Sequence, residues 1–185
     1  KLDYCRQHLQ DADALKALAV ADGLLETSIR HTRTLTFDLS VPVLYELGLA
    51  AALDWLAGHM QTQYGLAVKY HQTGAPFDLP VDRRVLIFQA VRELLMNVFK
   101  HARASQAWIR VKHSARRLQV TVQDNGLGIT PQQWAMRPTT THGIGLFSIR
   151  ERLDQLGGSC TLENINKAGA QITLTLPLKS IRGSK

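Results

Sequence analysis

Four polar side chains share one side of a helix predicted over Ile87–Ala102. At about 100° per residue, they fall within a sector of about 100°, and they are Glu93, Asn97, Lys100 and His101. The opposite sector is apolar and suits a core, with Ile87, Val91, Leu94, Leu95 and Val98. A solvated helix face would usually mix Glu, Lys, Gln and Arg. A carboxylate, an amide, an ammonium and an imidazole that converge can instead hold a divalent cation and the phosphates that it carries.

The segment Asp124–Gly128 (Asp-Asn-Gly-Leu-Gly) follows a predicted strand with apolar residues at alternate positions, Leu118, Val120 and Val122. An Asp at the end of such a strand can accept a hydrogen bond from an exocyclic amine, which would select adenine over guanine. Gly126 and Gly128 let the backbone turn sharply and approach a ligand closely. An ordinary Asp-Asn-Gly turn is the alternative interpretation of this segment taken alone.

A second glycine-bearing turn, His142–Leu146 (His-Gly-Ile-Gly-Leu), opens a predicted helix. Backbone N–H groups at a helix N-terminus bind phosphate, and Gly143 and Gly145 remove side chains that would block it. A single Gly-x-Gly is weak evidence by itself. It matches neither the dinucleotide-binding fingerprint nor a P-loop, because the third glycine and the Gly-Lys-Ser/Thr are missing.

Elements of both kinds must position these groups. Hydrophobic periodicity predicts helices at 12–40 and 43–63, separated by Pro42 because proline cannot continue a helix. In the second helix the residues expected to face inward are Leu44, Leu47, Ala51, Leu53 and Leu56. The later elements are expected as a strand at 66–71, a loop at 74–80, a helix at 81–102, a hairpin of strands at 106–113 and 117–124, a loop at 130–141, a helix at 143–156 closed by Gly157-Gly158, and strands at 159–164 and 170–178.

Helices that alternate with hairpins predict an α+β fold, a two-layer α/β sandwich. We expect three parts: a helical piece at 1–41, an α/β domain at 42–179 and a C-terminal tail at 180–185. The absence of an initiator Met suggests a segment of a longer protein, and we expect no membrane contact within it because no apolar run reaches about 18 residues.

The net charge of +7 suits nucleic acid, an acidic protein or a polyphosphate. One local cluster brackets a predicted hairpin turn and is interpreted first as a solvated hairpin tip; it contains Arg110, Lys112, His113, Arg116 and Arg117. The two cysteines, Cys5 and Cys160, lie far apart without metal-ligand spacing, which favours a reducing, cytoplasmic compartment.

Three segments in this order resemble the N, G1 and G2 boxes of sensor histidine kinases, which have the Bergerat-type ATP-binding fold. They are Glu93–Ala102, Asp124–Gly128 and Gly143–Leu146. Leu44–Leu53 and Gly145–Leu153 resemble the nitrate-sensor-like subgroup of these kinases, which has a short ATP lid. The resemblance covers about Leu35 to Pro177.

The resemblance implies ATP and Mg²⁺ as cofactors. By it, Asn97 chelates Mg²⁺, Glu93 is the catalytic base or orients water, and Asp124 holds the adenine amine. The remaining nucleotide-binding residues would be Lys100 and His101 at the phosphates, and Gly126, Gly128, Gly143, Gly145 and Leu146 around the lid. The helix before Ser40 is similar to the second helix of a dimerisation and phosphotransfer hairpin.

Two positions depart from the family's pattern. The phospho-accepting His usually precedes an acidic residue, whereas His8 precedes Leu9 and His31 precedes Thr32, so we expect the phospho-acceptor upstream of Lys1. The family often has Gly-Thr near the last strand, where this chain has Gly169-Ala170, which removes one expected contact with adenine.

The resemblance therefore predicts the ATP-binding catalytic domain of a sensor histidine kinase, with a response-regulator receiver domain as partner, a homodimer in the full-length protein and no direct contact with nucleic acid. Two alternatives stay open at this point. One is a Bergerat-fold protein serine kinase of the anti-sigma-factor type, and the other is a basic module that binds nucleic acid or protein.

Overall fold

The computed structural model describes residues 42–74, 77–135, 144–165 and 169–178. The chain divides into two units, Lys1–Val41 and Pro42–Lys185, and every described residue belongs to the second. The helix expected at 12–40 lies outside the described residues, and the three predicted parts of the chain stay predictions. None of the described helices is long and apolar enough to cross a membrane.

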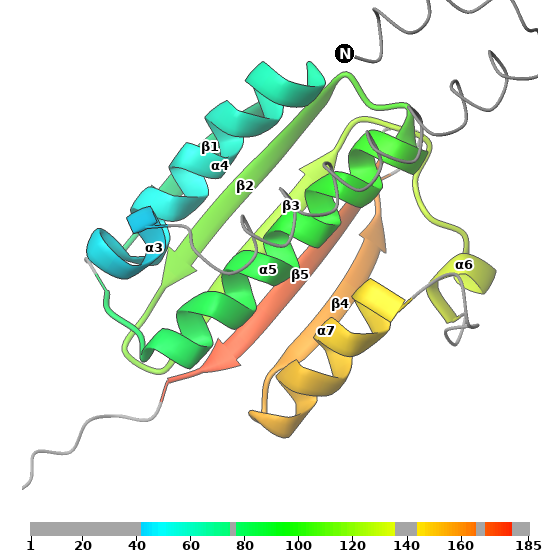
Figure 1. Cartoon of the computed structure of the whole chain (residues 1–185). Coiled ribbons are helices and arrows are strands. Elements are labelled where there is room, and N and C mark those ends of the chain that lie inside the picture. The colour runs from blue at the N-terminus through cyan, green and yellow to red at the C-terminus, as the bar shows by residue number, and fades with distance from the viewer. Residues whose placement is uncertain (1–41, 75–76, 136–143, 166–168, 179–185) are drawn as a thin grey trace, which may run out of the picture. The chain divides into compact units, whose positions relative to one another are not determined.

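Five strands form one mixed sheet in the order β1-β2-β3-β5-β4 (Figure 1). They are β1 (Ala67–Thr73), β2 (Gln106–His113), β3 (Arg117–Asp124), β4 (Ser159–Asn164) and β5 (Ala170–Pro177). The β1–β2 pair is parallel and the other three pairs are antiparallel. The alternation of polar and apolar residues in β2, β3 and β5 leaves one face of the sheet buried and the other polar.

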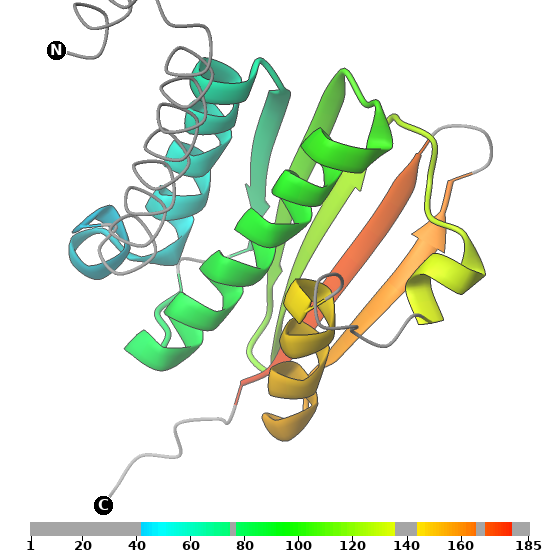
Figure 2. The same cartoon turned by 45° about the vertical axis from the view of Figure 1, so that its right-hand side comes forward.

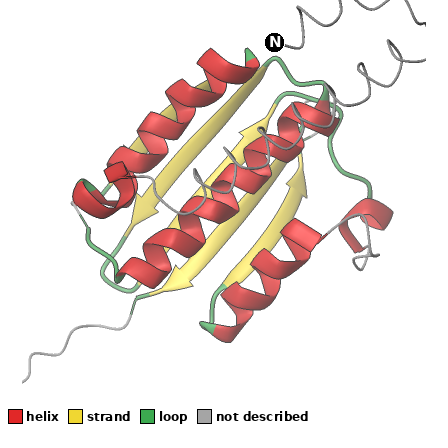
Figure 3. Ribbon diagram, viewed as in Figure 1, coloured by secondary structure: helices red, strands yellow, loops and turns green. Residues whose placement is uncertain are grey.

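In chain order the described helices are α3 (Pro42–Glu46), α4 (Gly48–Tyr64), α5 (Val81–Asn97), η1 (Val98–Ala102), α6 (Pro131–Ala135) and α7 (Ile144–Gln155). Helices α4, α5 and α7 lie on the apolar face of the sheet and complete a two-layer sandwich (Figures 2 and 3). Helix α4 packs on β1, α5 on β3, and α7 on β4 and β5. The predicted apolar side of the helix is confirmed, because Ile87, Val91, Leu94 and Leu95 of α5 and Val98 of η1 are all buried.

The α+β sandwich and its strands are confirmed, but two predicted elements differ. The helix expected at 43–63 is interrupted between α3 and α4, where Gly48 has φ +83°, a left-handed conformation that ends a helix. Leu47, expected to face inward, lies at this break and is 69% exposed. The loop expected at 130–141 contains the short helix α6, and its residues 136–141 lie outside the described part.

The two glycines of α4 provide a test of this break. A Cβ added at Gly48 or at Gly58 would meet no atom within 4 Å, so only the backbone distinguishes them. Because Gly48 has positive φ, Gly48→Ala should destabilise the protein by roughly 1–2 kcal/mol. Gly58 lies inside the helix, so Gly58→Ala should stabilise it by roughly 0.5–1 kcal/mol. Urea unfolding monitored by circular dichroism measures both, and equal effects of the two substitutions would contradict the assigned break.

Candidate functional site

The ends of several elements meet at one end of the sheet. Asp124, at the end of β3, pairs with Ala107 near the start of β2, while Asn164, at the end of β4, pairs with Ala170 at the start of β5. The neighbouring pair Gln123–Gln171 joins β3 to β5. The sheet therefore places the Asp124–Gly128 turn beside the segment that joins β4 to β5.

Asp124 is the buried polar residue of this end, with 5% of its surface exposed. Its Oδ1 accepts a hydrogen bond from the backbone N–H of Gly126 at 2.7 Å. Burial raises the pKa of the Asp124 carboxyl, while hydrogen bonds from the backbone N–H groups of Gly126 and Ala170 act in the opposite direction. The effect of burial on this pKa is larger than that of the two donors. A further hydrogen-bond donor would therefore stabilise the ionised carboxylate.

The end of the helix that bears the predicted polar stripe, called the polar helix below, is hydrogen-bonded directly to this turn. The backbone N–H of Leu127 donates to the carbonyl of Ala102 at 2.9 Å. A Cβ on Gly126 would lie 2.1 Å from the same carbonyl oxygen, a distance that no side chain can occupy. Gly126 is therefore required by the close approach of two backbones. This requirement is independent of any ligand.

Asn125 makes a second link that the sequence analysis missed. Its Oδ1 accepts hydrogen bonds from the backbone N–H groups of Ser105 at 3.0 Å and Gln106 at 2.9 Å, and its Nδ2 donates to Ser105 Oγ at 2.9 Å. It thus ties the Asp124 turn to the segment between the helix and β2. The sequence offered only the signature of a turn residue, because the partners lie about 20 positions away along the chain.

The helix that bears the predicted stripe changes its form before it ends. Residues 81–97 are α-helical, but Val98–Ala102 form a π-helix, and Arg103 then adopts φ +51°. Hydrogen bonds in a π-helix join residues five apart, so its turns are wider than those of an α-helix. The predicted α-helix through Ala102 is therefore wrong for its last five residues, and the angular positions of Lys100 and His101 follow the π-helix instead.

The structure places the four stripe residues along the last part of this helix. Glu93 and Asn97 lie one turn apart on α5 and are both partly exposed, whereas Lys100 and His101 lie on η1 and are exposed. Phe99, which lies between Asn97 and Lys100 in the sequence, is 45% exposed, and its ring packs against that of Tyr64 with 5.0 Å between the ring centroids. The contact between Leu127 and Ala102 brings η1, and with it Lys100 and His101, to the Asp124 turn.

The start of β5 and the residue before it also approach the Asp124 turn closely. Gly169 has φ +98°, and a Cβ there would lie 2.0 Å from the Asp124 carbonyl oxygen. Ala170, which stands where the sensor histidine kinases that this chain resembles often have Thr, is 2% exposed. Gly128 has φ +80°, and a Cβ there would lie 3.0 Å from Asn164 Oδ1.

The second predicted turn is only partly visible. Gly143 lies outside the described residues. Gly145 and Leu146 lie in the first turn of α7, which begins at Ile144, and the contacts of the Leu146 side chain lie outside the described part. The assignment of phosphate binding to these three residues stays a prediction.

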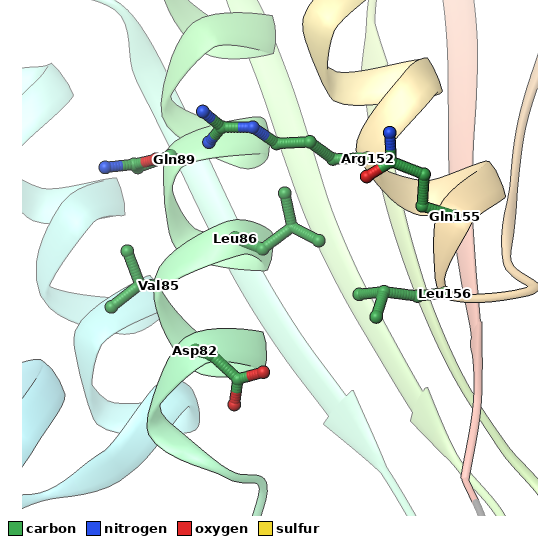
Figure 4. Close-up of a pocket in the computed structure, with 7 residues that line it drawn as sticks. All are labelled: Asp82, Val85, Leu86, Gln89, Arg152, Gln155 and Leu156. Atoms are coloured by element: carbon green, nitrogen blue, oxygen red, sulfur yellow. The ribbon is translucent and has the colours of Figure 1, made fainter.

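A pocket of about 220 Å³ lies elsewhere, between the first half of α5 and the second half of α7 (Figure 4). Arg152 extends from α7 toward α5 over an apolar floor, and the lining is Asp82, Val85, Leu86, Gln89, Arg152, Gln155 and Leu156. Gln89 precedes Asn97 by eight residues, which is about 12 Å along a helix. The pocket therefore does not reach Asn97, although Gln89 lies one helical turn before Glu93.

The turn of the basic cluster is also remote from Asp124, whereas Arg110 donates a hydrogen bond to Gln123, the residue before Asp124. Arg110 and Lys112 are exposed on β2, and Arg116 and Arg117 are exposed at the turn that joins β2 to β3. Arg117 and Asp124 are the two ends of β3, about 23 Å apart at 3.3 Å per residue. The interpretation of a hairpin tip fits this position.

The pKa of Asp124 provides a test in the absence of ligand. Because the folded pKa is raised above the ordinary value of 3.8, the unfolded chain releases its proton first as the pH rises. The contribution of Asp124 to the free energy of unfolding should therefore fall through the window above pH 3.8 and stay lower beyond the folded pKa. Asp124→Asn, which cannot ionise, should gain stability relative to the unmodified chain as the pH rises from 4 to 7.

Urea unfolding at several pH values measures this gain. The matched control is Asp54→Asn, which removes an exposed carboxylate from α4. A constant difference between Asp124→Asn and the unmodified protein across the pH range would show that burial does not penalise this carboxylate.

Comparison with known proteins agrees with this geometry. Residues 82–180 match the model of the histidine kinase-, DNA gyrase B- and HSP90-like ATPases. The chain is 30% identical over 179 residues to the sensor histidine kinase MctS of Rhizobium johnstonii, covering 96% of this chain and 37% of MctS. It is also 30% identical over 132 residues to the nitrate/nitrite sensor protein NarX of Escherichia coli, covering 71% of this chain and 21% of NarX.

Among solved structures, the histidine kinase domain of the blue-light activated histidine kinase EL346 from Erythrobacter litoralis matches with a TM-score of 0.55 and 25% identity, covering 70% of this chain and 61% of that one. The chain spans well under half the length of MctS and NarX. The fold resemblance and the nitrate-sensor-like resemblance stated above are both confirmed. The chain belongs to the histidine kinase-, DNA gyrase B- and HSP90-like ATPase family.

Proposed function

We propose that the chain is the ATP-binding catalytic domain of a sensor histidine kinase. It would transfer the γ-phosphate of ATP to a histidine on another segment for relay to the receiver domain of a response regulator. The observation that carries this proposal is the buried Asp124 carboxylate at the sheet end, with the end of the polar helix fastened to its turn. The names of the relatives favour a histidine kinase over a serine kinase.

Asp124 is the proposed adenine-recognition group. The exocyclic amine of adenine would donate a hydrogen bond to its carboxylate. This bond would offset the free energy that burial of the charged group costs. Guanine has a carbonyl oxygen at that position, which would face the carboxylate without a proton between them. The same burial that costs stability in the free protein therefore favours adenine over guanine.

The residues at the helix end suit the phosphates and Mg²⁺. Mg²⁺ keeps several water ligands and takes few from protein, so one amide oxygen from Asn97 together with phosphate oxygens would suffice. Lys100 and His101 are exposed beside the Asp124 turn, where they would neutralise phosphate charge. Glu93, one turn before Asn97, would orient water or accept the proton of the phosphate acceptor. Catalysis would consist mainly of positioning and charge neutralisation.

The assembly around the domain is part of the proposal. Dimerisation would involve the predicted helix before Ser40, and the domain would act in the cytoplasm, where ATP is available. The exposed basic turn at Arg116 and Arg117 lies at the other end of β3 from the proposed nucleotide site. ATP binding that requires Mg²⁺ and is insensitive to added DNA would separate the kinase from a nucleic-acid-binding module.

Asp124→Asn should weaken ATP binding. A hydrogen bond to a charged acceptor contributes roughly 1.5–3 kcal/mol, so the Kd for ATP should rise by about one to two orders of magnitude. Discrimination against GTP should also diminish. Competition of ATP and GTP for a fluorescent analogue measures both effects. Unchanged ATP affinity in the folded variant would reduce Asp124–Gly128 to an ordinary turn.

Asn97→Asp should impair binding of Mg²⁺-ATP more than it affects folding, because it places a negative charge beside the phosphates at constant size. The matched control is Gln89→Glu, which adds a negative charge to the same helix about 12 Å away. Titration of both variants with ATP in the presence and absence of Mg²⁺ provides the comparison. Equal losses in the two variants would indicate a general charge effect and contradict the assignment of Asn97.

Glu93→Gln should reduce phosphate transfer while leaving nucleotide binding closer to normal, if Glu93 acts on the proton of the acceptor.

The isolated chain should bind ATP without labelling itself, since neither His8 nor His31 precedes an acidic residue. Transfer is therefore measured with the full-length parent kinase and radiolabelled ATP. Acid-labile phosphate on His8 or His31 of the isolated chain, or equal losses of binding and transfer in Glu93→Gln, would contradict these assignments.

A further inference from the structure

The last residue of β4 makes a paired contact with a segment 35 positions before it. Asn164 Oδ1 accepts a hydrogen bond from the backbone N–H of Ile129 at 3.0 Å, and Asn164 Nδ2 donates to the carbonyl of Ile129 at 2.7 Å. One side-chain amide therefore satisfies both backbone groups of one residue, as a neighbouring strand would. The contact is exposed, so core packing does not require it.

Ile129 is the residue at which the chain leaves the Asp124–Gly128 turn. Gly128 immediately before it has φ +80°, and its Cα lies so close to Asn164 that an added Cβ would be 3.0 Å from Oδ1. The far side of Asn164 is fixed as well, because it pairs with Ala170 in the sheet. Asn164 thus joins the end of the turn to the strand pair that flanks Asp124.

The neighbouring turn reinforces this arrangement. The backbone N–H of Ile165 donates to the carbonyl of Gly169 at 3.1 Å, and Gly169 lies against the Asp124 backbone and carboxylate. The pairing of β3 with β5 and the Gly169 contact already bring together the two segments that enclose Asp124, and Asn164 adds the side-chain link that fixes Ile129 to them.

We propose that Asn164 is a positioning residue of the nucleotide site: its amide fixes Gly128 and Ile129 against the β4–β5 end, so that the glycine turn is ordered before nucleotide binds. This inference rests on the proposed ATP site. Without the paired contact, nucleotide binding would have to order the turn, and that entropic cost would appear as weaker affinity.

Two variants separate the parts of the contact. Asn164→Ala removes both hydrogen bonds and should raise the Kd for Mg²⁺-ATP about tenfold, which corresponds to about 1.4 kcal/mol. Asn164→Asp retains an acceptor for the Ile129 N–H but turns a second oxygen toward the Ile129 carbonyl. Once protonated, this carboxyl has one donor and one acceptor, as the amide does.

The affinity of Asn164→Asp should therefore approach that of the unmodified protein as the pH falls from 7 to 4, while the defect of Asn164→Ala should persist. Each Kd is divided by that of the unmodified protein at the same pH, which removes the titration of ATP and of Asp124 from the comparison. Amide hydrogen exchange should show faster exchange at Ile129 in Asn164→Ala, with protection in β5 unchanged.

The matched control is Glu163→Ala on the same strand. It removes a side-chain hydrogen bond between Glu163 and Gln171 at 3.3 Å but leaves the contact with Ile129 intact. Its ATP affinity should stay within about twofold of that of the unmodified protein, a free-energy difference of about 0.4 kcal/mol.

The outcomes distinguish this inference from the function on which it rests. An unmodified protein that does not bind ATP would reject both. ATP binding by the unmodified protein with equal affinity in Asn164→Ala, together with faster exchange at Ile129, would overturn the positioning role and leave the proposed function standing. A loss in Glu163→Ala as large as that in Asn164→Ala would also overturn it. If Asn164→Ala does not fold, the absence of pH-dependent recovery in Asn164→Asp would do the same.

Discussion

The contact between Gly126 and the Ala102 carbonyl is the constraint on which the rest of this site depends. Two backbone segments approach so closely there that a methyl group would lie 2.1 Å from the carbonyl oxygen. The hydrogen bond from Leu127 to the same carbonyl holds them in place. Because one segment ends the polar helix and the other begins immediately after Asp124, their contact sets the relation between Asn97 and the buried carboxylate.

Much of this arrangement was predictable from local patterns. The alternation in β2, β3 and β5 reflects one buried face, and the apolar side of α5 reflects another, so the sheet, the helix layer and their class followed from periodicity. Asp124 and Gly126 were likewise identified from residue type and order. The helix break at Gly48 was missed because the apolar pattern of 43–63 continues across it and glycine alone does not specify a positive φ.

The contacts that hold the site together were not predictable in the same way. Asn125 and Asn164 act through backbone groups far along the chain, and backbone groups leave no trace in the residue types of their partners. The change from α-helix to π-helix at Val98 is a second case, because periodicity arguments assume one helical form throughout. Local sequence thus identified the chemical groups at this end of the sheet, whereas long-range backbone pairing determines how they are held.

The parallel pairing of β1 and β2 has a consequence for the order of folding. Ala67 pairs with Gln106, so a loop of 39 positions that contains all of α5 must close before the pair can form. Parallel strands cannot be joined by a tight turn, and non-local pairs form slowly because chain entropy is lost before contacts are gained. The antiparallel β2–β3 hairpin, by contrast, closes through a short turn at Ser114. We therefore expect the hairpin to form early and β1, with the helix α4 that packs on it, to join β2 late, so that the β1 edge of the sheet is completed after the hairpin that ends at Asp124.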